Sequence, residues 1–181
     1  MISLFCAVIF ILNFLQYQAT VTIDFDEDLR ECGNGLPMPD MDMSQFSILP
    51  QDDGSLLLNG TVTINKSYND PTRWKMYTER LEQGKWNPGI VSRDIPNLCP
   101  VLKMPSEPWY QYTKHLENLH CPINAGYVER LDNLNIGNMA AVFDVPPQFI
   151  GEWRVYHEIS TFRNGLPARE CFMIPTTIAE V

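Results

Sequence analysis

Residues 151–162 read GEWRVYHEISTF, and this stretch decides the fold class. One row of alternate positions is mostly apolar: Trp153, Val155, His157 and Ile159. The other row is mostly polar: Arg154, Tyr156, Glu158 and Ser160. Successive side chains of a β-strand point to opposite faces, so the alternation predicts a strand with one face turned towards a core. The pair Asn164-Gly165 follows and is typical of a β-hairpin turn.

A second stretch, Ser55–Ile64, has the sequence SLLLNGTVTI and follows the turn signal Asp52-Asp53-Gly54. Its even positions are Leu56, Leu58, Gly60, Val62 and Ile64, and its odd positions from 59 onward are polar. This again predicts a strand with one buried face.

The rest of the chain also reads mainly as β-structure, and scattered prolines disfavour long helices. We expect strands or extended segments at Arg73–Glu82, Gly126–Ile136 and Glu170–Val181, and a strand end or irregular run within Ile90–Leu102. Trp109–Leu119 is expected to form a short helix, because Tyr112, Leu116 and Leu119 recur at spacings of four and three. Several short strands of this kind predict a two-sheet β-sandwich.

The first residues predict a secreted protein. Ile2–Leu15 is an uncharged apolar run that leads to small residues at Ala19 and Thr20, which is typical of a secretory signal peptide cut near Ala19. The alternative is an uncleaved N-terminal anchor, but a spanning helix needs about 20 apolar residues. We therefore expect residues 1–19 to be a signal peptide and residues 20–181 to form a single extracellular domain.

Four cysteines follow the signal peptide: Cys32, Cys99, Cys121 and Cys171. An even number in a secreted chain implies two disulfides, with three possible connectivities. The short separation of Cys99 from Cys121 favours that pair and leaves Cys32 with Cys171.

Two N-glycosylation triplets fit the same compartment. They begin at Asn59 and Asn65, and both asparagines fall on the polar face of the expected strand. We therefore expect both to carry glycans.

The charge pattern excludes some classes of binding partner. The net charge is −9, and no cluster of Lys and Arg could follow a phosphate backbone or an anionic membrane surface. We therefore expect neither a nucleic-acid partner nor stable membrane insertion.

The stretch HLENLHCPINAG at residues 115–126 resembles a metal site, but its spacing does not support one. The two histidines are five residues apart, with no HExxH pattern, and the chain contains no Cys-x-x-Cys. A nucleophilic pair of His120 and Cys121 is disfavoured as well, because adjacent residues of a strand point to opposite faces. Cys121 is best explained as half of a disulfide.

A secreted hydrolase is the alternative from another functional class. The chain has no GxSxG motif and no phosphate-binding glycine loop, and its acidic residues fall mainly in turns and on polar faces. We expect no enzymatic activity, no catalytic residue, no metal and no cofactor.

The aromatic residues are numerous for a chain of this size, and ordinary core packing explains any single one of them. A two-sheet sandwich can also open between its sheets and hold an apolar ligand. The inward positions of the two best strands and two nearby aromatics are the expected lining of such an inter-sheet cavity: Leu58, Val62, Ile64, Phe143, Phe149, Trp153, Val155 and Ile159. The ligand should be mostly hydrocarbon, since His157 is the one polar member of the inward rows.

Short motifs in the region Ser55–Val181 occur in a distinctive order: Cys99 with a Leu before it, Leu119 before Cys121-Pro122, Gly126-Tyr127, a Leu/Asn stretch, Pro146-Pro147 and Gly151-x-Trp153-Arg154. In this order the chain resembles the insect chemosensory protein A and B group. Those small secreted proteins are similar to the ML lipid-recognition domain and to the ganglioside activator protein.

The resemblance implies an immunoglobulin-like β-sandwich that holds a lipid or other long apolar molecule between its sheets. It also implies a role in detecting contact pheromones, with a membrane receptor as a further partner. A lipid-transfer or innate-immune lipid-recognition protein of the same fold is the alternative.

Overall fold

The computed structural model describes residues 20–26, 29–107, 109–116 and 118–181, so the expected signal peptide lies outside the described residues. Its strands are β1 Val21–Phe25, β2 Arg30–Glu31, β3 Met41–Asp42, β4 Ser47–Pro50, β5 Leu56–Ile64, β6 Arg73–Glu82, β7 Lys85–Ile95, β8 Tyr127–Asn135, β9 Gly151–Arg163 and β10 Leu166–Glu180. Its helices are η1 Cys99–Val101, α2 Tyr110–Thr113, α3 Met139–Val142 and η2 Pro147–Phe149.

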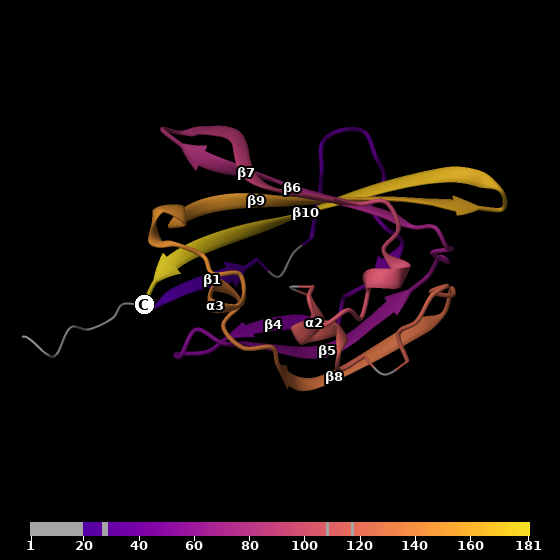
Figure 1. The fold of residues 1–181 in the computed structure, drawn as a ribbon, viewed down its shortest axis with the longest axis horizontal. Coiled ribbons are helices and arrows are strands. Elements are labelled where there is room, and N and C mark those ends of the chain that lie inside the picture. The colour runs from indigo at the N-terminus through magenta and orange to yellow at the C-terminus, as the bar shows by residue number, and fades with distance from the viewer. Residues whose placement is uncertain (1–19, 27–28, 108, 117) are drawn as a thin grey trace, which may run out of the picture.

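The strands form two antiparallel sheets that lie one above the other as a β-sandwich (Figure 1). The larger sheet has the order β1-β10-β9-β6-β7, and β2 also pairs with β10. In the smaller sheet β5 is central and pairs with β8 along one edge. Its other edge pairs with β4 near the start of β5 and with β3 near its end.

The hairpin of β9 and β10 is the longest pairing of the larger sheet. Asn164 and Gly165 both have positive φ, 52° and 76°, which is the conformation of the turn expected from the sequence. Because β6 and β10 flank β9 on both sides, the alternating row of β9 sets the faces of the whole sheet.

The smaller sheet bends at a bulge between β5 and β8. Leu58 pairs with Leu134, whereas Gly60 pairs with Leu131, so β8 contains one extra residue at this point. Asn133 takes up the irregularity with a φ of 47°. The extra residue turns Leu131 and Leu134 to the same face despite their spacing of three, and both pack with Leu58.

Buried apolar side chains form two clusters. The first lies where α3 meets β1, and its buried members are Ile23, Leu56, Met139, Ala140, Trp153 and Ile178. Asn138 holds α3 there, because its amide accepts hydrogen bonds from the nitrogens of Ala140 and Ala141 and donates to the carbonyl of Val21. The second cluster lies on the smaller sheet, around Leu58, Leu116 and Leu131.

Both expected disulfides are present. Cys32 bonds to Cys171 across a separation of 139 residues, and Cys99 bonds to Cys121 across 22. The first joins the chain beyond β2 to β10, and β1 and β2 both pair with β10. Disulfides of this kind are typical of oxidising compartments outside the cytosol.

One expectation needs correction. The helix expected over Trp109–Leu119 is only α2, and beyond Thr113 the chain continues in single turns, such as those closed by Leu116 N to Thr113 O and Leu119 N to Leu116 O. The strand end or irregular run expected within Ile90–Leu102 is confirmed, because β7 ends at Ile95 and the 3-10 turn η1 follows, and most side chains of β7 are exposed. The strands β1 to β4 were not expected from the sequence.

The two sequon asparagines differ in their surroundings. Asn65 is exposed directly after β5, and its amide donates to Asp40. Asn59 is half-buried, and its side-chain oxygen accepts a hydrogen bond from the nitrogen of Asn133 at 3.4 Å. Glycosylation at both stays a prediction, and Asn65 is the more accessible acceptor.

Gly60 is a position where the fold requires glycine. Its φ is 106°, and an added Cβ would lie 1.7 Å from the carbonyl oxygen of Gln45. Gly84 has a φ of 75° with open space around it, so Gly84→Ala measures the cost of a positive φ without a steric clash. We expect Gly84→Ala to lower the free energy of unfolding by about 1 kcal/mol and Gly60→Ala by about 3 kcal/mol or more.

Denaturant unfolding of the two variants and the wild type measures both values. Equal losses for Gly60→Ala and Gly84→Ala would show that the close approach of the Gln45 backbone does not constrain this strand.

Candidate functional site

A pocket of about 150 Å³ lies between the two sheets at the end where β3 meets β5. Its lining is nearly all apolar and consists of Met41, Ile64, Tyr68, Thr72, Trp74, Leu98, Cys99, Cys121, Ile123 and Ile159. An engineered apolar cavity of comparable size, about 150 Å³, stays dry and binds benzene. The pocket therefore has room for one ring or a short stretch of alkyl chain.

Each sheet contributes one cross-strand pair to this pocket. The smaller sheet supplies Met41 of β3, which pairs with Ile64 of β5. The larger sheet supplies Trp74 of β6, which pairs with Ile159 of β9. Paired residues share a face of their sheet, so these two pairs identify the inner faces of the sandwich.

The polar atoms of the lining already have partners in the protein. The hydroxyl of Tyr68 donates to Oε2 of Glu170 at 2.8 Å, and the hydroxyl of Thr72 donates to the carbonyl oxygen of Asn69 at 2.5 Å. Burial and the Glu170 carboxylate raise the pKa of Tyr68, so its hydroxyl stays protonated. These hydroxyl groups are therefore already hydrogen-bonded within the protein, and the pocket offers a ligand mainly apolar surface.

A buried ion pair holds Tyr68 in place. Arg163 donates through Nη1 and Nη2 to the two carboxylate oxygens of Glu170, at 2.5 and 3.0 Å. Glu170 is only 3% exposed, and the guanidinium of Arg163 also lies over the ring of Tyr68. The buried carboxylate of Glu170 is thus compensated by the partly exposed guanidinium of Arg163, and the network positions one wall of the pocket.

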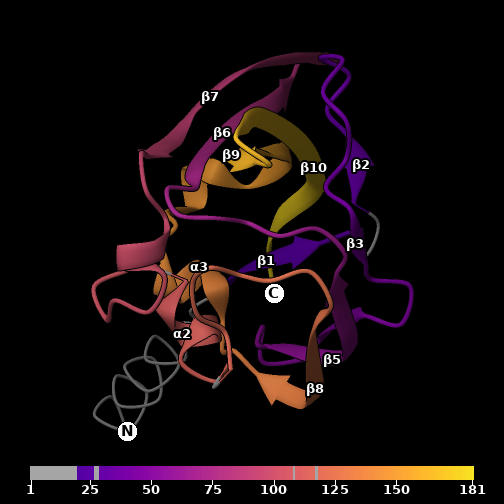
Figure 2. The ribbon, with the colours of Figure 1, turned by 90° about the vertical axis from the view of Figure 1, so that its right-hand side faces the viewer.

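The segment between Cys99 and Cys121 closes one side of the inter-sheet space, where it lies between the two layers in Figure 2. Trp109 packs edge-on against Trp74 of the larger sheet, with ring centroids 5.3 Å apart. Leu116 is buried in the cluster on the smaller sheet. The segment therefore contacts both inner faces, and the Cys99–Cys121 disulfide ties its two ends together beside the pocket.

The inner face of the larger sheet is incompletely covered beyond Trp74. Its central side chains are only partly buried although they face the other sheet: Met76, Val155, His157, Phe172 and Ile174. None of them belongs to either buried cluster. Closely packed cores bury their central side chains almost completely, so this row is less tightly covered than the two buried clusters.

His157 is the polar group of that row. Its ring stacks on Phe172, with centroids 4.6 Å apart, and its Nδ1 accepts a hydrogen bond from Nε1 of Trp74 at 3.2 Å. Burial lowers the pKa of His157 to about 4, so the imidazole is neutral at physiological pH.

The eight residues expected to line a cavity are distributed differently in the structure. Ile64 and Ile159 line the pocket. Trp153 and Phe149 instead pack in the first apolar cluster, where Trp153 fills the space between β9 and α3. Leu58 packs in the second cluster. Val62 and Val155 are half-buried and lie outside the pocket lining, and Phe143 is 45% exposed beyond α3.

Most of the pocket was missed because it is built by loops and short strands. Tyr68, Thr72, Leu98 and Ile123 lie outside the named strands, and Met41 belongs to a strand of two residues. Trp74 was expected on an alternating strand, but nothing in its own segment indicates which residue of the other sheet it faces. Besides the alternation that indicated Ile64 and Ile159, the favoured pairing of Cys99 with Cys121 was a usable signal.

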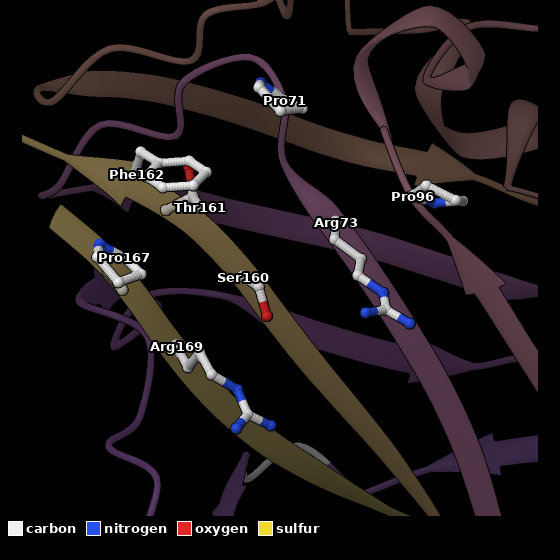
Figure 3. A pocket seen from close by; sticks show the side chains of 9 residues that line it. Pro71, Arg73, Pro96, Ser160, Thr161, Phe162, Pro167 and Arg169 are labelled. Atoms are coloured by element: carbon white, nitrogen blue, oxygen red, sulfur yellow. The ribbon is translucent and has the colours of Figure 1, made fainter. Parts of the chain in front are cut away.

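A second pocket, of about 280 Å³, lies on the outer face of the larger sheet (Figure 3). Arg73, Ser160 and Arg169 stand in one row across β6, β9 and β10, next to Phe162 and Pro167. Both guanidinium groups have acidic partners, since Arg73 pairs with Asp94 and Arg169 pairs with Glu158. The compensated charges and open position make it a weaker candidate site for an apolar molecule than the inter-sheet pocket.

The described part of the chain has neither a candidate metal site nor a helix that could span a membrane. Residues 20–26, 29–107, 109–116 and 118–181 contain no group of three or more His, Cys, Asp or Glu side chains placed to hold a metal ion. In the same ranges, none of the helices has the length and apolar character needed to cross a membrane. No protein-family model matches the chain, and a search of curated proteins found no match.

The buried imidazole predicts a pH-dependent stability. The pKa of His157 is lowered from 6.5 to about 4 in the folded protein, so the unfolded chain binds more protons between these values. The stabilising contribution is therefore complete above the unfolded pKa and is lost as the pH falls towards the folded one. Between pH 7 and pH 5 we expect the wild type to lose about 2 kcal/mol of unfolding free energy through this group.

Denaturant unfolding at the two pH values measures the loss. His157→Gln should remove most of the slope, whereas His115→Gln, at an exposed histidine, should keep it. Exposed carboxyl groups whose pKa is lowered, such as Asp40 beside Lys66, titrate below this window. A full slope in His157→Gln would contradict the assignment.

Proposed function

We propose that this protein is a secreted, non-enzymatic carrier of a lipid or other long apolar ligand, and that it acts in chemosensation. The observation that carries the proposal is the apolar pocket between the sheets, together with the partly covered inner face that leads away from it. Two disulfides support an extracellular setting.

The pocket explains how an apolar chain would bind. It is smaller than the roughly 300–1,000 Å³ of ordinary ligand sites, so it takes one end of the ligand. The rest of the ligand's hydrocarbon chain lies along Val155 and Ile174, towards the end of the sandwich that Trp153 fills. Each buried methylene contributes about 0.8 kcal/mol, so ~10 methylenes support micromolar binding after the costs of association.

Chemosensation is the part of the proposal that rests on the motif order around Cys99, Cys121-Pro122, Pro146-Pro147 and Gly151–Arg154. That order resembles the insect chemosensory protein A and B group, whose members detect contact pheromones. A carrier with this role would deliver its ligand to a membrane receptor, which is the partner we propose.

The binding test is a titration with a fluorescent naphthylamine probe, followed by displacement with fatty compounds of increasing chain length. We expect micromolar uptake by the wild type. Ile159→Trp should weaken uptake at least about tenfold, because the added ring occupies the pocket without exposing new apolar surface. Val128→Trp, at a position 45% exposed on β8, is the matched control and should bind as the wild type does.

Thermal melts establish that both tryptophan variants are folded before their affinities are compared. Absence of uptake by the wild type across all chain lengths would contradict the carrier function. Uptake that Ile159→Trp leaves unchanged would place the ligand outside the inter-sheet pocket.

A further inference from the structure

The Nε2 atom of His157 has no hydrogen-bond partner among the described residues, and its ring is only partly buried on the inner face of the larger sheet. The other ring nitrogen, Nδ1, accepts from Nε1 of Trp74. An indole nitrogen only donates, so Nδ1 must be the unprotonated nitrogen of the neutral ring. The hydrogen of the imidazole therefore resides on Nε2, and this N–H group is left without an acceptor.

The direction of this N–H group follows from the position of His157 on β9. The residue pairs with Met76 of β6 and Phe172 of β10, and it shares the inner face with the pocket residue Ile159. Nε2 is at the tip of the side chain, so it points away from the larger sheet into the inter-sheet space. The side chain keeps some accessible surface there despite its burial.

Among the described residues, the strand neighbours of His157 on the same face offer it no side-chain oxygen or nitrogen as an acceptor. The neighbours on the same face are apolar: Met76, Val155, Phe172 and Ile174. Charged groups on the inner faces already have partners, since Glu170 pairs with Arg163 and Glu107 pairs with Arg93. Glu129 of the smaller sheet accepts the hydroxyl of Tyr127. A donor that loses water without gaining an acceptor costs free energy, so a ligand that displaces water from Nε2 binds better if it supplies an acceptor.

We propose that Nε2 of His157 donates a hydrogen bond to a neutral carbonyl oxygen of the ligand, so that the site selects a long-chain ester, ketone or aldehyde. This inference rests on the proposed function and specifies the chemistry of its ligand. The carbonyl meets His157 inside the sandwich, one short stretch of the hydrocarbon enters the apolar pocket beside Trp74 and Ile159, and the rest lies along Val155 and Ile174.

The same geometry disfavours two related compounds. A plain hydrocarbon leaves the N–H group unpaired. A free fatty acid brings a carboxylate into an apolar space where the imidazole is neutral and the nearby cations Arg93 and Arg163 are already paired, so the carboxylate would lose its hydration without gaining a counter-charge. The order of affinity is therefore carbonyl compound first, then hydrocarbon, then carboxylate.

The experiment uses three competitors of equal chain length, an alkane, a methyl ester and a fatty acid at neutral pH, against the bound naphthylamine probe. The wild type should bind the ester about five- to tenfold more tightly than the alkane, which is the effect of one neutral hydrogen bond. His157→Phe keeps the aromatic stack and should abolish the preference. His157→Gln retains a donor and should keep part of it, and His115→Phe should keep all of it.

A second measurement is independent of how the variants fold. In wild-type protein with labelled histidines, the Nε2–H resonance of His157 should move downfield with the ester and stay in place with the alkane. Equal affinity for ester and alkane, or an unshifted resonance on saturation with ester, overturns the inference and leaves the carrier function standing. Failure of every compound and of the probe to bind overturns the carrier function itself.

Discussion

Trp153 is the side chain on which the closed end of the sandwich depends. It is 4% exposed, and its indole nitrogen donates to the carbonyl oxygen of Phe149 at 2.8 Å. Phe149 packs against one side of the ring, and the guanidinium of Arg80 lies over it at 5.3 Å. In the same cluster are Leu56 of the smaller sheet and Ile23 of β1, so one indole joins both sheets, α3 and the first strand.

The position of Trp153 determines which end of the sandwich is closely packed. The second cluster, around Leu58, Leu116 and Leu131, covers the smaller sheet and reaches the first only through Ile48 and Ile136. The far half of the larger sheet carries Trp74, whose indole packs against Trp109 of the segment between Cys99 and Cys121. The apolar pocket lies at this end of the sandwich, away from the cluster around Trp153.

Sequence patterns predicted the central strands and missed the periphery, for a physical reason. The strands β5, β6 and β9 have one face turned inward, so burial imposes a period of two on their residues. The edge strand β7 contains Pro88 and Gly89 and has almost no buried residue, so no such period arises. The spacing of Tyr112, Leu116 and Leu119 correctly indicated a common face, since all three pack in the same cluster. It did not determine the length of the helix, because a single helical turn followed by isolated turns places the three side chains on one face as well.

The site was harder to predict than the fold, because a pocket depends on which residues of the two sheets oppose each other. Alternation placed Ile64 and Ile159 on inner faces, and both line the pocket. It assigned Trp153 and Val155 to the same cavity with equal weight, although the first fills the closed end and the second borders the uncovered row. Loop residues such as Tyr68 and Ile123 carry no periodic signal at all.

The central claim, that an apolar chain lies between the sheets, is tested most directly by nuclear Overhauser effects between a bound methyl ester and labelled side-chain methyl groups. The account predicts contacts from the alkyl chain to the methyl groups of Ile64 and Ile159 on opposing sheets of the same molecule. Contacts confined to the outer pocket, at Phe162, Pro167 and Ala168, with none to Ile64 or Ile159, would contradict it.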